Sequence, residues 1–209
     1  MFDLEYLLSL DRLIALLIMC LTSMPVHEWA HAWTAYELGD DTAALHGRLT
    51  LNPLAHMDLY GTISLFLGFL GWGKPVPVNI NRLRGNMRAS WALVSIAGPF
   101  SNLVMAMLAA IPFRLELLNG SGEIVQFLQQ VFAYMIIINL SLMLFNLIPV
   151  PPLDGSRILG WLLPGQLAQG MDRLERVAGP MLIIVAFLIA RLPLFNQILT
   201  WLLQLLLWY

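Results

Sequence analysis

Long apolar runs without charged residues alternate with short polar segments along the chain. The hydrocarbon core of a bilayer is about 30 Å thick, so a crossing helix needs about 20 apolar residues. The pattern predicts four crossing helices, at 10–37, 89–113, 124–148 and between Arg176 and Arg191. The uncharged part of the fourth is too short to cross unaided, so either the helix begins earlier or its arginines extend to the interface. A fifth run, 192–209, is expected to cross the bilayer or to lie in its interface.

The segment that follows the first run is predicted to be irregular. Residues 59–73 are uncharged but glycine-rich, and as a helix they would reach only about 22 Å. We therefore expect a re-entrant element there, with a spanning helix as the alternative. Prolines and valines alternate over 74–79, which favours an extended edge segment because proline interrupts a helix. The predicted fold is thus an all-α polytopic membrane protein with about four to six transmembrane helices and a short re-entrant or β segment near residues 45–80.

Composition supports this assignment and excludes several classes of protein. The chain is 59% hydrophobic and 11% charged, with a mean hydropathy of +0.75. A soluble domain has roughly 45–50% apolar and about 25% charged residues. An ordinary cytosolic domain, a disordered chain and a nucleic-acid-binding protein are therefore excluded. We expect one transmembrane domain over 1–209, with its core at about 10–160 and C-terminal helices at 161–209, since no loop is long enough for a further domain.

The distribution of cations predicts how the chain is oriented. If the four helices alternate and 59–73 returns to its own side, the segments 38–88 and 154–176 share one side of the membrane. These two segments contain eight of the eleven lysines and arginines. The positive-inside rule then places them in the cytosol. We therefore expect a multi-pass protein of the cell (inner) membrane.

The first apolar run contains His27, Glu28 and His31 in the pattern His-Glu-x-x-His. Residues four apart on a helix share one face, so both imidazoles can bind one Zn²⁺ ion, expected as one per chain. Glu28 lies beside the first ligand, where it can accept a proton from a water. A polar patch lining a cavity is the alternative, but three ionisable groups at membrane depth are costly without a cation to neutralise them.

A hydrolytic zinc site uses three protein ligands and one open position, so a third ligand is required. The candidates in or beside the apolar runs are Asp58, His46, His56 and Asp154. Asp154 is preferred, because in the predicted topology it meets His27 and His31 at a similar depth on the same side. That side is the cytosolic one, so we expect the active site to face the cytosol. The alternative is that Asp154 only caps the helix beginning near residue 156.

Three motifs together resemble the site-2 protease family of intramembrane zinc metalloproteases. They are His-Glu-x-x-His at 27–31, Ala-Gly-Pro-x-x-Asn at 97–102 and Asn-x-x-Pro-x-x-Pro-Leu-Asp-Gly at 146–155. Residues 52–58 and 71–79 further resemble the small bacterial branch, which lacks PDZ and CBS domains. The chain departs from that branch at 58–61, where Asp-Leu-Tyr-Gly replaces the usual Asp-Pro before the glycine region.

The resemblance implies roles for individual residues. It implies that His27, His31 and Asp154 bind zinc and that Glu28 is the catalytic base. It also implies that Asn146 lies near the active site, where it would hold substrate or an oxyanion. From the extended character of 74–79, we expect Val76 and Val78 to offer backbone donors and acceptors to a substrate strand.

The expected function is hydrolysis of peptide bonds within or near transmembrane segments of membrane proteins, by a zinc metalloendopeptidase. The expected partners are a membrane-embedded protein substrate and the lipid bilayer, with no nucleic acid; the sequence leaves the oligomeric state open. Two alternatives are a non-catalytic zinc-containing membrane scaffold and a metal-ion transporter. An intact Glu28 argues against the scaffold, and the lack of charges along 89–113 argues against a transport path.

Overall fold

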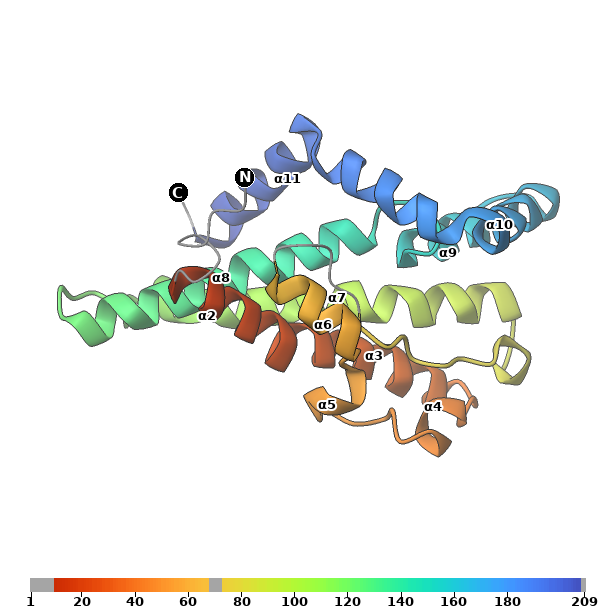
Figure 1. Cartoon of the computed structure of the whole chain (residues 1–209), viewed down its shortest axis with the longest axis horizontal. Coiled ribbons are helices and arrows are strands. Elements are labelled where there is room, and N and C mark those ends of the chain that lie inside the picture. The colour runs from red at the N-terminus through yellow and green to blue at the C-terminus, as the bar shows by residue number, and fades with distance from the viewer. Residues whose placement is uncertain (1–9, 68–72, 208–209) are drawn as a thin grey trace.

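The computed structural model describes residues 10–67 and 73–207, and within these ranges it is built from helices (Figure 1). Three stretches are long and apolar enough to cross a membrane: Leu13–Glu37, Met87–Arg114 and Glu123–Asn146. A fourth is a bent pair, Met181–Ala190 and Pro193–Leu207, whose halves meet at 60°. The predicted all-helical multi-pass fold is therefore confirmed, with three or four candidate spans among the described residues.

The first span consists of α2 (Leu10–Ile18), a π-helical turn (Met19–Ser23) and α3 (Met24–Glu37). Pro25 lies at the start of α3 and has no N–H to continue the hydrogen-bond ladder of the preceding turn. A π-turn at this point is a typical adjustment of a helix with one displaced hydrogen bond. This π-helical turn lies just before His27, so it sets the direction of α3, the helix that carries both histidines.

Two long helices form the centre of the molecule, α7 (Met87–Arg114) and α8 (Glu123–Asn146). Figure 1 shows them lying along each other, with α2 and α3 on the other side of α7 and α8 from the bent pair α10 (Gly165–Ala190) and α11 (Pro193–Leu207). Alanines of α7 pack against larger apolar residues of α8; the cluster comprises Ala106, Ala109, Ala110, Ile136, Leu140 and Met143. Small residues allow two membrane helices to approach closely, which accounts for this contact.

The helix α10 begins at Gly165, well before Arg176, so of the two alternatives for the fourth run the earlier start of the helix is confirmed. Its first half is polar and packs beside α9 (Asp154–Leu162). Arg157 of α9 forms an ion pair with Glu175 of α10 at 2.7 Å, and its guanidinium lies 5.3 Å from the ring centre of Trp91 on α7. These contacts join α7, α9 and α10 at the end of the molecule where α3 ends.

Short elements follow α3: α4 (Thr42–Leu45), α5 (Pro53–His56), α6 (Leu59–Phe66) and a 3-10 turn (Ile80–Arg82). Met57 and Gly73 form an isolated antiparallel bridge, and the Lys74 N–H donates to the His56 carbonyl at 2.8 Å. The chain that leaves at residue 57 therefore returns to the same place at residue 73. Most of the predicted re-entrant segment is α6, while residues 68–72 lie outside the described residues.

Of the re-entrant or β segment predicted near 45–80, the β alternative is wrong: the described residues there form only the single bridge between Met57 and Gly73. The reason lies in the partners of the 74–79 backbone. The carbonyls of Lys74 and Pro75 accept from Arg48, while the N–H groups of Val76 and Asn79 donate to carboxylates. Side chains thus satisfy backbone groups that a neighbouring strand would otherwise pair.

Candidate metal centre

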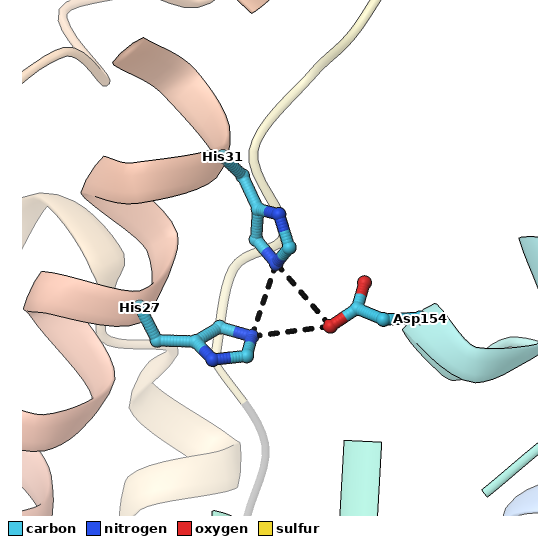
Figure 2. Close-up of side chains that lie close together, drawn as sticks. All are labelled: His27, His31 and Asp154. Carbon is cyan, nitrogen blue, oxygen red and sulfur yellow. Dashed lines mark hydrogen bonds and ion pairs between the residues drawn. The ribbon is translucent and has the colours of Figure 1, made fainter. Parts of the chain in front are cut away.

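Three ligand atoms from two distant segments converge at one point (Figure 2). The Nε2 atoms of His27 and His31 are 3.0 Å apart, and each lies 3.3 Å from Oδ2 of Asp154. Both histidines are buried, and the Asp154 side chain is 16% exposed. The three residues are the group predicted from the sequence, and among the described residues they form the one cluster with metal-binding geometry.

This donor set fits a zinc ion. Two ligands at a tetrahedral angle around zinc, each about 2.05 Å away, lie about 3.3 Å from each other. The observed separations of 3.0 and 3.3 Å match that spacing. Oδ2 of Asp154 is moreover buried without a hydrogen-bond partner. A buried acceptor facing two imidazole nitrogens requires a cation or protons between them, and two histidines with one carboxylate are a common catalytic zinc set.

Hydrogen bonds behind the rings orient both histidine ligands. Nδ1 of His31 lies 2.7 Å from the carbonyl of Val94, which can only accept, so this nitrogen carries the proton. Nδ1 of His27 lies 2.7 Å from Oδ1 of Asn102 in the same way. In both rings the Nε2 lone pair is left facing the centre. Such partners fix the tautomer and the ring plane of metal-binding histidines.

Asn102 belongs to a buried polar chain that links three helices. Its Nδ2 donates to Oδ1 of Asn139 at 2.9 Å and to the carbonyl of Ser23 at 3.3 Å. Asn139 in turn donates to Oγ of Ser23 at 3.0 Å. All three side chains are fully buried. Because Asn102 donates through Nδ2 to these groups, its oxygen is the atom turned toward His27.

Asp154 is brought to the centre by the turn between α8 and α9. It is the first residue of α9 and not its N-cap, which is Leu153. The alternative that Asp154 only caps this helix is therefore wrong. A Cβ on Gly155 would lie 2.2 Å from the carbonyl oxygen of Leu147, so only glycine lets α9 fold this closely over the end of α8.

Burial raises the pKa of the Asp154 carboxyl, but the positive charge that His31 and His27 carry when they are protonated outweighs burial and holds that pKa well below its ordinary value. The carboxyl is thus kept ionised by its surroundings. An ionised carboxylate is the form that binds a metal.

Gly98 of α7 lies directly against the rings of His27 and His31. A Cβ at this position would lie 2.3 Å from Nε2 of His31 and 2.6 Å from Cε1 of His27. Any side chain here would occupy the space of the ligand atoms. The glycine therefore lets the backbone of α7 approach both imidazoles.

Glu28 lies beside the ligands and is hydrogen-bonded to the extended segment 74–79. Its Oε2 accepts from the N–H of Val76 at 3.1 Å. A cavity of about 200 Å³ lies in front of the centre and is lined by Glu28, the three ligands and the segment's Val76 and Val78. The predicted base and the predicted substrate-binding valines therefore surround one hollow.

Asn146, the last residue of α8, also lines this cavity. Its Nδ2 donates to the carbonyl of Leu142 at 3.0 Å, within its own helix. The amide is therefore held close to the centre without touching a ligand atom. Its role remains a prediction.

The other sequence candidates for the third ligand have local structural partners. His46 is exposed, with Nδ1 2.8 Å from the Thr42 carbonyl. His56 is fully buried, with Nε2 2.8 Å from the Thr50 carbonyl. Asp58 accepts from the Gly61 N–H at 2.9 Å, at the start of α6. All three stabilise turns, and none belongs to the metal group.

The sequence interpretation left Gly98, Asn102, Asn139 and Ser23 without a role at the site. The signal for the first two was present, since both lie in the Ala-Gly-Pro-x-x-Asn run at 97–102. For Ser23 and Asn139 the only signal was polarity within otherwise apolar runs. Polar residues inside a membrane are costly and mark interhelical contacts or sites.

Comparisons with known proteins agree with this geometry. The profile of Peptidase family M50 matches residues 114–190, a range that includes Asp154. The chain is 44% identical over 163 residues to YwhC of Bacillus subtilis (strain 168), a zinc metalloprotease by name, covering 77% of this chain and 74% of the relative. It is 35% identical over 142 residues to Rip2 of Mycobacterium tuberculosis (strain ATCC 35801 / TMC 107 / Erdman), also a zinc metalloprotease by name, covering 66% of this chain and 53% of the relative.

No solved structure matches the chain. The match to YwhC covers about three quarters of both proteins at an identity that only relatives of one family share. The match to YwhC spans 163 residues, so it extends beyond residues 114–190, which the family profile matches. The chain therefore belongs to peptidase family M50, the site-2 protease family.

Proposed function

We propose that this M50 peptidase is a zinc-dependent endopeptidase that uses Glu28 as its general base and cleaves peptide bonds within or next to the transmembrane segments of membrane proteins. The observation that carries the proposal is the position of the His27, His31 and Asp154 group. It lies beside the Glu28 carboxylate, in a cavity partly lined by the first candidate membrane-crossing stretch.

Zinc held by these three residues would polarise the scissile carbonyl and lower the pKa of the attacking water. Glu28 then accepts the proton of that water and passes it to the leaving amine. Its hydrogen bond from Val76 aims one carboxylate oxygen, while the other remains available for this transfer. Asn102 and the Val94 carbonyl keep both imidazoles in the required orientation throughout.

The substrate must be extended when it is cleaved, because a helix hides each carbonyl in a hydrogen bond to the N–H four residues on. We infer that an unwound substrate segment lies along 74–79 and pairs with backbone groups of Val76 and Val78 other than the Val76 N–H, which donates to Glu28. Asn146 is inferred to hold a substrate carbonyl or the oxyanion. Both inferences are supported by the shared cavity in front of the ligands.

We further infer that the centre faces the cytosol and that the whole chain, 1–209, acts as one protease domain. His31 lies about 9 Å along the helix axis from the end of α3 at Glu37, at ~1.5 Å per residue. Water from that side therefore has a short path to the site. The natural substrate is inferred to be a membrane-embedded protein.

The two rival functions lack support from the site. A zinc scaffold needs no carboxylate beside its ligands, whereas Glu28 lies in the cavity with them. A metal transporter needs polar groups across the whole membrane. In the described helices, α7 has no charged residue between Arg88 and Arg114, and α8 has none after Glu123.

Purified protein in vesicles, with a single-span model substrate, tests the proposal. The wild type should bind one zinc per chain and cleave the substrate, and a chelator should abolish cleavage. Glu28→Gln should keep zinc and retain about 1% of the activity or less, since general-base catalysis contributes typically 10²–10⁴-fold. Near-normal cleavage by Glu28→Gln would remove Glu28 from this role, and zinc binding without any cleavage by the wild type would favour the scaffold.

A further inference from the structure

A second cavity, also of about 200 Å³, meets the metal centre from the side of α6. It lies between the first span, α6 and α8, and it shares His27, Glu28 and Asn146 with the cavity in front of the ligands. The predicted base and the Asn146 amide therefore form the boundary between two hollows. The mechanism described above uses only the first.

The walls of this second cavity are apolar and adaptable. Met19, Met24 and Met57 contribute thioethers, and α8 contributes Leu142 and Phe145. Apart from the shared Glu28 and His27, none of the residues lining it is ionisable except Cys20. Methionine is flexible and polarisable, so such walls fit apolar groups of different shapes. Away from Glu28 and His27 at the shared boundary, a charged group would lose its hydration there without gaining a partner.

The size of the cavity limits what can enter. An apolar protein cavity of about 150 Å³ holds a benzene molecule. The second cavity therefore has room for one large side chain, but a helix about 10 Å across does not fit. Gly73 leaves room for the Met24 side chain in the wall of this cavity, because a Cβ at position 73 would lie 1.5 Å from Cε of Met24.

We propose that the second cavity is a specificity pocket that receives the apolar side chain of one substrate residue flanking the scissile bond. The inference rests on the proposed function. A scissile bond between the ligands and Glu28 places the neighbouring substrate residue at the shared boundary, where its side chain enters the cavity that shares His27, Glu28 and Asn146 with the site. The pocket selects for large apolar residues and against charged ones.

Cys20 provides a direct probe, because it lines the pocket and is the one cysteine of the chain. The cleavage position in a single-span substrate is first mapped with the wild type. Single cysteines are then placed along that substrate and tested for disulfide formation with Cys20 in the uncleaving Glu28→Gln protein. We expect a disulfide at one residue flanking the bond and none two helical turns away, with loss of the product in Cys20→Ser. No disulfide at either flanking residue, or equal yields at distant positions, would overturn the proposal.

Changing the size of the pocket gives a second readout. Leu142→Ala should raise, and Cys20→Phe should lower, the kcat/KM for a substrate with tryptophan at the flanking position relative to one with alanine, each by about tenfold or more. Leu144→Ala is the matched control, since Leu144 packs against the α7–α8 cluster and does not line the pocket. An unchanged ratio in Leu142→Ala, with normal zinc and folding, would show that the cavity is a packing void or a lipid site.

Failure of the two proposals is distinguishable. If the wild type cleaves no substrate at all, the proposed function fails. If it cleaves but neither the disulfide pattern nor the size preference follows the pocket, the specificity pocket alone fails.

Discussion

At the residue scale, each metal ligand depends on a neighbour that never touches the metal. His27 depends on Asn102, His31 on the Val94 carbonyl, and Asp154 on the absence of a side chain at Gly155. Partners of this kind typically contribute 10–100-fold in metal affinity or activity. The metal centre therefore includes these neighbouring groups as well as its three ligands.

The assignment of the third ligand predicts opposite results for two variants. Asp154→Ala should lower zinc occupancy and abolish cleavage, because it removes a ligand. His56→Ala should leave zinc near one per folded chain, since the ring of His56 bonds to Thr50. Elemental analysis of both purified proteins decides the question. Loss of zinc in His56→Ala but not in Asp154→Ala would reverse the assignment.

Gly98→Ala should be far more damaging than an ordinary glycine substitution in a helix. Its methyl group would lie 2.3 Å from Nε2 of His31, in the space of the ligand atoms. We expect loss of most bound zinc and destabilisation of about 1–3 kcal/mol from overpacking.

The matched control is Gly179→Ala in α10, where a Cβ meets nothing within 4 Å. Alanine there should leave zinc unchanged and favour the helix by up to about 1 kcal/mol. Zinc content and thermal unfolding separate the two cases. Normal zinc binding by Gly98→Ala would mean that α7 can move away from the histidines at no cost to the site.

Sequence reasoning found the ligands because each carries chemistry that an apolar run does not need. His27 and His31 have helical spacing, and Asp154 follows a proline-rich break. It did not assign a role to Gly98, since a glycine in a helix reports nothing about the atoms facing it. That information exists only once α7 is packed against α3.

At the element scale, the extended segment 74–79 shows the limit of pattern reading. Alternating prolines and valines correctly indicate an extended chain but cannot show where its hydrogen bonds go. Those bonds go to Arg48, to Asp40 at 2.6 Å from the Asn79 N–H, and to Glu28. The segment is thereby held at the metal centre by side chains and not by a partner strand.

Disulfide trapping tests whether substrate adds along this segment. Single cysteines at 76–79, in a Cys20→Ser and Glu28→Gln background, are combined with cysteines flanking the substrate's cleavage site. We expect cross-links that alternate along 76–79, because successive residues of a strand point to opposite faces. Cysteines in the 115–122 loop serve as the control. The absence of cross-links along 76–79, together with strong cross-links to the 115–122 loop, would contradict strand addition.

The helix-scale predictions succeeded where the runs were long and uncharged, as in α7 and α8. The last two runs were harder to predict, because α10 and α11 meet at 60° around Arg191 and Pro193. Hydropathy gives the length of an apolar segment, whereas a bend at its centre depends on packing. The two runs expected separately thus form one bent pair.

At the scale of the whole molecule, the metal centre lies toward one end of the long helices. α3 ends six residues beyond His31, and α8 ends shortly before Asp154, so both segments reach the centre near the same end. Arg48, Arg88 and Arg157 belong to this end as well, with Arg88 donating to the Leu163 carbonyl at 2.8 Å. The opposite end holds the short 115–122 connection between α7 and α8.

This polarity predicts the orientation of the protein in the cell. The cation-rich end, with the metal centre, should lie in the cytosol, and the 115–122 connection should lie outside. Single cysteines at the exposed positions Leu51 and Asn119, in a Cys20→Ser background, report the two ends. A thiol reagent that cannot cross membranes should label Asn119→Cys in intact spheroplasts and Leu51→Cys only after lysis. Labelling in the reverse order would place the centre on the outer side, and water and substrate would then have to reach it from outside the cell.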